Sequence, residues 1–254
     1  MGDFFCTFAQ RKKHEMTTAK TIEAALFDLA EGEAKRQILS SFFKTGQGEY
    51  GEGDRFIGVS VPRQRTLAKQ IGSLPLTEID ALLQSPYHEC RMTALLLLVD
   101  MFAKSNCATE RQTIYDFYIG HHQRINNWDL VDLSAPQIVG NYLIDKPRQT
   151  LQRYAQSDCL WLQRIAIVAT FAFIKRHEYA DTLAIAQQLL HHRHDLIQKA
   201  VGWMLREVGK RDFDTEIRFL TENGRYKTLP RTMLRYAIEK FPEPLRLRFL
   251  RSEV

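Results

Sequence analysis

Apolar residues recur along most of this chain at the spacing of three and four that is typical of amphipathic helices. Two such patterns lie within residues 17–43. Further patterns cover 64–72, 76–84, 88–103, 109–120, 127–144, 147–156, 160–175, 178–190, 194–209, 213–222 and 229–241. No segment shows the strict alternation of a half-buried strand. The sequence therefore predicts an all-α protein built from many short helices.

A glycine-rich segment interrupts this pattern between Thr45 and Val59, where five glycines occur. It is not a phosphate-binding loop, because no Gly-Lys-Ser/Thr follows it. Val61-Pro62 then opens the next predicted helix, with proline in the favourable first turn. We expect residues 1–16 to form a flexible N-terminal extension and residues 17–254 to form a single domain.

Several of the predicted helices begin alike, with a basic residue ahead of an apolar run. The basic residues are Arg91, Arg164, Lys199 and Arg231, and the intervals between them are 73, 35 and 32 residues. The first interval is about twice as long as each of the other two. Trp128 stands 36 residues before Arg164. A repeat of about 35 residues, with one helix pair in each, indicates an α-solenoid of HEAT-like repeats.

Equivalent positions of successive repeats line one surface of a solenoid. We therefore expect a concave, basic groove that carries Trp128, Asp132, Arg164, Lys199 and Trp203 together. Each residue also has a plain structural explanation. Either tryptophan could belong to the core, Asp132 could form a structural bridge with Arg164, and Arg164 and Lys199 could be solvated.

A basic stripe follows the helix predicted at 194–209 and continues just beyond it. Lys199, Trp203, Arg206 and Lys210 follow one another at intervals of four, three and four, so they share a helix face. A basic stripe with an aromatic ring set in it suits a nucleic-acid backbone. We expect Arg164, Lys199, Arg206 and Lys210 to bind DNA.

The net charge supports a polyanionic partner. The chain carries +5 overall; residues 151–254 carry 18 Lys and Arg against 12 Asp and Glu, a balance of +6, and the rest carries −1. Such sidedness favours one face for a polyanion over a merely solvated basic surface.

Other classes of protein are not favoured. No apolar run reaches the roughly 18 residues of a membrane span, and the N-terminus lacks the pattern of a secretory signal, which favours the cytoplasm. The four cysteines form no C-x-x-C pair, so neither a disulfide framework nor a zinc site is expected. The histidines at 121–122 and 191–194 have no partners at ligand spacing and read as structural. We expect no metal, no cofactor and a monomer.

Four motifs, in order, resemble the AlkD-type DNA alkylation-repair glycosylases, which are HEAT-like repeat DNA glycosylases. The motifs are Asp54-Arg55-Phe56-Ile57-Gly58-Val59-Ser60-Val61-Pro62-Arg63, Trp128-Asp129-Leu130-Val131-Asp132, Trp161-Leu162-Gln163-Arg164 and the run Ile197–Glu207 with its Ile-Gln-Lys-Ala-x-Gly-Trp-x-Leu-Arg-Glu pattern. The resemblance covers most of the chain.

The resemblance implies excision of positively charged N3- and N7-alkylpurines from double-stranded DNA, with the protein cytoplasmic and associated with the nucleoid when bound to DNA. It also implies an active-site tetrad of Trp128, Asp132, Arg164 and Trp203. Cleavage of the glycosidic bond passes through an oxocarbenium-like sugar, which one carboxylate could stabilise while positioning water. An alkylated purine is already cationic, so it needs no general acid, and Asp132 is the only acidic member of the set.

Three alternatives remain open at this point. One is a non-catalytic HEAT-like protein that binds damaged or unusual DNA structures, as some relatives in the broader group do. Another is a protein-interaction scaffold, which predicts an apolar rather than a basic groove. The third is a metal-dependent enzyme, which the absence of ligand spacing disfavours.

Overall fold

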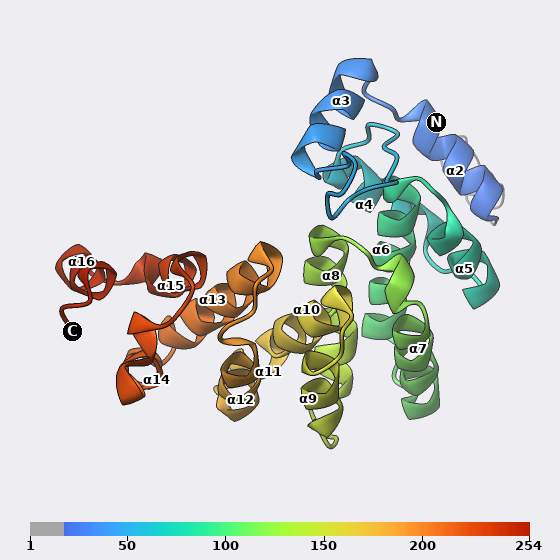
Figure 1. Ribbon diagram of the computed structural model, residues 1–254. Helices are drawn as coiled ribbons and strands as arrows, with labels where there is room; N and C mark the ends of the chain where they lie inside the picture. Colours follow the sequence, from blue (N-terminus) through green and yellow to red (C-terminus); the bar gives the residue numbers. More distant parts are fainter. Residues whose placement is uncertain (1–17) are drawn as a thin grey trace, which may run out of the picture. The chain divides into compact units, whose positions relative to one another are not determined.

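The computed structural model describes residues 18–254, and these residues form helices joined mostly by short connections, with one long glycine-rich loop between Phe42 and Val61 (Figure 1). Over this described range no strand is present, and one isolated β-bridge joins Arg55 to Tyr87. The all-α prediction is therefore confirmed. The extension predicted for residues 1–16 lies outside the described residues. The chain divides into two compact units, with the boundary between Leu130 and Val131; the single domain predicted for 17–254 stays a prediction.

The first unit is organised around one buried helix, α6. Its helices are α2 (Ala19–Asp28), α3 (Glu33–Phe42), α4 (Val61–Ile71), α5 (Leu76–Gln84), α6 (His88–Lys104) and α7 (Ala108–Gly120), followed by the 3₁₀ turn His122–Arg124. α2, α4, α5 and α7 all pack on α6. Every residue of α6 from His88 to Leu98 is buried, which fits a helix that is apolar on nearly all sides. The charged residues in its first turn are also buried, although they are not apolar.

The second unit repeats a pair of helices. Its helices are α9 (Gln149–Ala155), α10 (Leu160–Ala169), α11 (Phe171–Ile174), α12 (Ala180–Leu189), α13 (Asp195–Gly209), α14 (Phe213–Thr221), α15 (Arg231–Ala237) and α16 (Glu243–Arg251), with 3₁₀ turns at Glu222–Lys227 and Ile238–Lys240. α10 packs on α13 and α13 on α15, while α9 packs on α12. Within each pair, α9 packs on α10 and α12 on α13. The helices α10, α13 and α15 thus form one row, and α9 and α12 form a second row beside it. This arrangement is the expected helical repeat.

The predicted helix at 127–144 is broken in the structure. α8 (Trp128–Ser134) ends before Pro136, and a π-helix follows over Pro136–Gly140, in which the amide of Gly140 donates to the carbonyl of Ala135 at 2.9 Å. Proline has no backbone N–H to continue the α-helical ladder, so the turn widens. The sequence pattern also missed α16, whose start is marked by Pro242 and Pro244 rather than by an apolar stripe.

Gly202 allows α13 and α15 to approach closely. A Cβ added there would lie 2.4 Å from the carbonyl oxygen of Met233. We therefore expect Gly202→Ala to lower the free energy of unfolding by about 2 kcal/mol, through the forced separation of the helices. Gly120→Ala is the matched control: an added Cβ there meets nothing within 4 Å, so this change should be neutral or stabilise by roughly 0.5 kcal/mol. Urea unfolding measures both, and equal effects would contradict the packing argument.

Candidate active site

Asp132 and Arg164 form a two-pronged ion pair in the second unit. The Nε of Arg164 donates to Oδ1 of Asp132 at 2.9 Å, and Nη2 donates to Oδ2 at 2.7 Å. Asp132 lies on α8 and Arg164 on α10, so the pair joins two helices that are 32 residues apart in sequence. A two-pronged contact holds the carboxylate in one orientation, which a single hydrogen bond does not.

Arg164 is buried, with 5% of its side chain exposed, whereas the side chain of Asp132 is 19% exposed. The remaining nitrogen of the guanidinium, Nη1, donates to the carbonyl of Leu196 on α13. The possibility that Arg164 is a solvated side chain is therefore wrong. Its position indicates that the guanidinium supports the carboxylate from the protein side, while Asp132 keeps an edge toward solvent.

Trp203 lies on α13 and is half-buried. Its ring packs at an angle against Phe171, with 6.0 Å between the ring centroids. Two cations lie over that phenylalanine ring, Lys175 at 4.6 Å and Arg211 at 5.7 Å. The surroundings of Trp203 therefore combine aromatic faces with positive charge.

The predicted basic stripe lies on α13, but each of its basic residues already has an acidic partner. Lys199 pairs with Asp195 at 2.6 Å, and Lys210 pairs with Glu207 at 2.6 Å. Arg206 pairs with Glu239. The side chains of Lys199 and Lys210 are 38% and 39% exposed. The stripe is thus partly neutralised within the protein, which the sequence pattern did not indicate.

Trp128 is the first residue of α8 and belongs to the first unit. Its ring stacks on Phe43, with 5.4 Å between the centroids and 24° between the planes. Its indole Nε1 donates to the hydroxyl of Tyr50 at 3.2 Å, and the exposed Phe42 lies edge-on to it at 5.9 Å. Because Trp128 and Asp132 are four residues apart on α8, they share a face of that helix.

A buried cluster of charges lies behind the first turn of α8. His88 donates to the carboxylates of Asp129 at 2.8 Å and Asp54 at 3.3 Å, and Arg91 donates to Asp54 at 2.6 Å. Burial alone would raise the pKa of Asp54, but the hydrogen bond from His88 and the charge of Arg91 outweigh it, and its pKa is lowered. The cluster connects the glycine-rich loop, α6 and the start of α8.

Glu89 ties the glycine-rich loop to the same end of α6. Its buried carboxylate accepts hydrogen bonds from three successive backbone amides, those of Ile57 at 2.9 Å, Gly58 at 2.8 Å and Val59 at 3.2 Å. Gly58 has φ of +95°, a conformation that other residues rarely adopt. The loop is therefore held by a specific acceptor.

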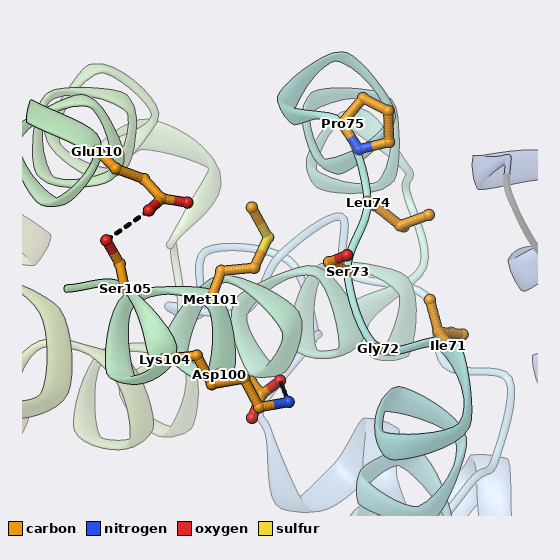
Figure 2. Close-up of a pocket in the computed structure, with 10 residues that line it drawn as sticks. All are labelled: Ile71, Gly72, Ser73, Leu74, Pro75, Asp100, Met101, Lys104, Ser105 and Glu110. Carbon is orange, nitrogen blue, oxygen red and sulfur yellow. Dashed lines mark hydrogen bonds and ion pairs between the residues drawn. The ribbon is translucent and has the colours of Figure 1, made fainter. Parts of the chain in front are cut away.

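A separate pocket of about 700 Å³ lies in the first unit (Figure 2). It is lined by Ile71, Gly72, Ser73, Leu74, Pro75, Asp100, Met101, Lys104, Ser105 and Glu110. Four of its polar side chains bond in pairs, Lys104 to Asp100 at 2.5 Å and Ser105 to Glu110 at 2.5 Å. None of the residues predicted from the sequence lines it, so the candidate site lies elsewhere.

Comparison with known proteins decides the family. The family model for DNA alkylation repair enzymes matches residues 22–241. The chain belongs to the DNA alkylation repair enzyme family.

A solved structure of this fold, described as a predicted DNA alkylation repair enzyme from Enterococcus faecalis, matches with a TM-score of 0.63 and 16% sequence identity, covering 85% of this chain and 98% of that one. At this identity the likeness shows the fold. A comparison with curated proteins gives no match. Membership of the DNA alkylation repair family supports a role in alkylation repair, with DNA as the substrate.

Sequence reasoning gave no role to several residues that surround the segment Trp128–Asp132: it did not name His88, and it named Asp54 only as part of a motif. His88 bonds Asp129, which lies 41 residues later in the sequence, and Tyr50 bonds Trp128, which lies 78 residues later. Asp54 lies 75 residues before Asp129, and His88 bonds both of them. No local spacing connects them. Across residues 18–254, no helix is long and apolar enough to cross a membrane, and no group of three or more His, Cys, Asp or Glu is placed to hold a metal ion.

Proposed function

We propose that this protein is a DNA N-glycosylase that excises cationic N3- and N7-alkylated purines by hydrolysis of the N-glycosidic bond. The observation that carries the proposal is the Asp132–Arg164 pair, in which a partly exposed carboxylate is fixed in orientation by a buried guanidinium. A preorganised carboxylate stabilises positive charge that develops on a reacting atom, at no cost of reorganisation.

The reaction balances with one carboxylate. The bond between C1′ and the purine nitrogen breaks, and its electron pair goes to the purine, which cancels the positive charge of the alkylated base. The sugar becomes oxocarbenium-like beside Asp132. Water, oriented by Asp132, then bonds to C1′ and gives up a proton, which passes to bulk solvent directly or by way of Asp132. The leaving base needs no proton, so no second acid is required.

The two tryptophans supply aromatic faces for a cationic nucleotide. A cation over an indole ring gains about 0.5–2 kcal/mol, depending on how far it is desolvated. Trp128 is held by Phe43 and Tyr50 and is half-buried, and Trp203 is half-buried beside Phe171. Both rings are therefore packed on one side and partly open on another, as such contacts require.

The basic residues of α13 provide the proposed backbone contacts. The pair Lys199–Asp195 is exposed on both sides, and exposed ion pairs contribute only about 0–1 kcal/mol, so a phosphate group can replace Asp195 at little cost. Lys210 is exposed beside the buried Glu207, which Arg211 also bonds, so this carboxylate keeps a partner when Lys210 turns to a phosphate. We propose that Lys199, Arg206 and Lys210 bind the DNA backbone. The direct DNA contact expected of Arg164 is not part of this proposal, because its guanidinium is buried and bonds Asp132 and the carbonyl of Leu196; Arg164 acts through Asp132 instead.

Release of free base from alkylated DNA tests the proposal. Purified protein is incubated with methylated duplex DNA in the presence of EDTA, and the bases released are identified by mass spectrometry. We expect 7-methylguanine or 3-methyladenine above the level of spontaneous loss in a protein-free blank. Salt-dependent binding of the same DNA without base release would instead support a non-catalytic DNA-binding protein.

A further inference from the structure

His88 is a buried imidazole between two carboxylates. It is 3% exposed, and its Nε2 lies 2.8 Å from Asp129 and its Nδ1 lies 3.3 Å from Asp54. Asp129 is the residue immediately after Trp128 in the first turn of α8. Its other oxygen, Oδ1, accepts from the amide of Leu130 at 2.8 Å, so the carboxylate is fixed at both ends.

A cluster of packed rings links the same imidazole to Trp128. His88 lies 4.8 Å from Phe56 and 5.0 Å from Phe43, between ring centroids, and these two phenylalanines stack on each other at 5.2 Å. Phe43 in turn stacks on Trp128 at 5.4 Å. His88 is therefore connected to Trp128 by two routes, one through Asp129 on α8 and one through the rings. Rings packed against one another in this way cannot shift one at a time without losing contact.

We propose that His88 is a positioning residue, which sets the orientation of the Trp128 ring through its bond to Asp129 and through the Phe56–Phe43 stack. This inference rests on the proposed function for its effect on catalysis, but not for its effect on Trp128. His88 itself does not touch the DNA, because it is buried behind these residues. No feature of the resemblance or of the basic stripe pointed to it.

The charge of His88 makes the inference testable by pH. Burial lowers its pKa, but the charge of Asp129 and the hydrogen bonds with Asp129 and Asp54 outweigh burial and the repulsion from Arg91, and raise the pKa from 6.5 to about 9. The charged groups that face His88 are therefore Asp129 on α8, Asp54 in the loop and Arg91 on α6. The stability that this contact contributes is fully present below pH 6.5 and is lost as the pH rises through about 9, where the imidazole loses a proton and can donate to only one of the two carboxylates.

The position of the Trp128 ring can be followed directly. The chain contains three tryptophans, so 5-fluorotryptophan labelling gives three ¹⁹F resonances, and Trp128→Phe identifies one of them. In the wild type we expect this resonance to move with a midpoint near pH 9, the pKa of His88. In His88→Gln the movement should disappear, and the rate of base release should fall by roughly 10- to 100-fold with DNA affinity unchanged, because a misplaced contact slows the chemical step.

His121→Gln is the matched control. His121 is also stacked on an aromatic ring, that of Phe117 at 4.1 Å, and also bonds a carboxylate, that of Asp80 at 3.0 Å. It has no link to Trp128 through these partners. This variant should keep both the Trp128 resonance and the rate of base release.

Asp129→Asn serves where His88→Gln does not fold. It keeps the size of the side chain and removes the charge that raises the pKa of His88, so the midpoint of the Trp128 resonance should move below pH 9. A Trp128 resonance that is unchanged in both variants and independent of pH would overturn the positioning role. A resonance that follows His88 in a protein that releases no base would uphold that role and remove the proposed function instead.

Discussion

Asp132→Asn is expected to slow the release of 7-methylguanine and 3-methyladenine by roughly 100- to 1000-fold, the range typical for loss of one preorganised electrostatic group in an active site. The substitution keeps the shape of the side chain and removes its negative charge. The oxocarbenium-like sugar then loses its stabilising partner, and Arg164 is left as an uncompensated buried cation. Duplex DNA affinity should be retained, because the carboxylate does not attract phosphate. Single-turnover base release and fluorescence anisotropy with the same DNA measure the two effects.

The loss of the ion pair must be separated from the loss of chemistry. Arg148 and Asp181 form a similar arginine–aspartate pair in the same unit, at 2.9 Å, with side chains 16% and 24% exposed. Asp181→Asn should therefore lower stability without slowing base release. If Asp132→Asn and the wild type release base equally fast, the role proposed for Asp132 is wrong. If both aspartate variants slow release equally, the effect comes from stability alone.

Glu89→Ala is expected to lower the free energy of unfolding by at least about 3 kcal/mol. The variant leaves three amides, those of Ile57, Gly58 and Val59, without the acceptor that now serves them, and each buried unsatisfied group costs about 1–3 kcal/mol. The variant also leaves a cavity, because the side chain of Glu89 is only 1% exposed and is packed inside the protein. Urea unfolding followed by circular dichroism gives the change.

Two further variants show whether the three hydrogen bonds are the cause. Glu89→Gln keeps one carbonyl oxygen in place, so its loss of stability should lie between those of Ala and the wild type. Glu78 accepts a single backbone hydrogen bond, from Ala19 at 2.7 Å, and Glu78→Ala should cost only about 1 kcal/mol. A loss at Glu89 no larger than that at Glu78 would show that the loop does not depend on this carboxylate.

The residues of the candidate site were largely accessible from sequence, but their interactions were not. The approximately 35-residue repeat put Arg164 on one helix and Trp203 on a later one, and the structure places them on α10 and α13. Helical periodicity is a local property, so an apolar stripe predicts where a helix lies and which face it buries. It does not predict which acidic residue a basic one meets. The basic stripe on α13 shows this, since Glu239, 33 residues beyond Arg206, is one of its partners.

His88 and Glu89 show the same limit at the start of α6. Both looked like ordinary first-turn residues of an apolar helix, with nothing in their spacing to mark them. Their partners come from the glycine-rich loop, 30 to 34 residues earlier, and from Asp129, 41 residues later. A buried charge is stable only where such partners surround it, and they are assembled by packing.

The sequence by itself determined the helical class, the repeat and the identity of the motif residues, because helix formation and apolar burial depend on residues three and four apart. It also led to the prediction, carried here as a proposal, of a site with one carboxylate among basic and aromatic residues. The tertiary structure alone decided that Arg164 forms an ion pair with Asp132 and that the basic residues of α13 have carboxylate partners. It also decided that a buried histidine, His88, bonds Asp129, the residue next to Trp128. Those features depend on contacts between helices distant in sequence, where short-range charge and hydrogen-bond geometry select the partners.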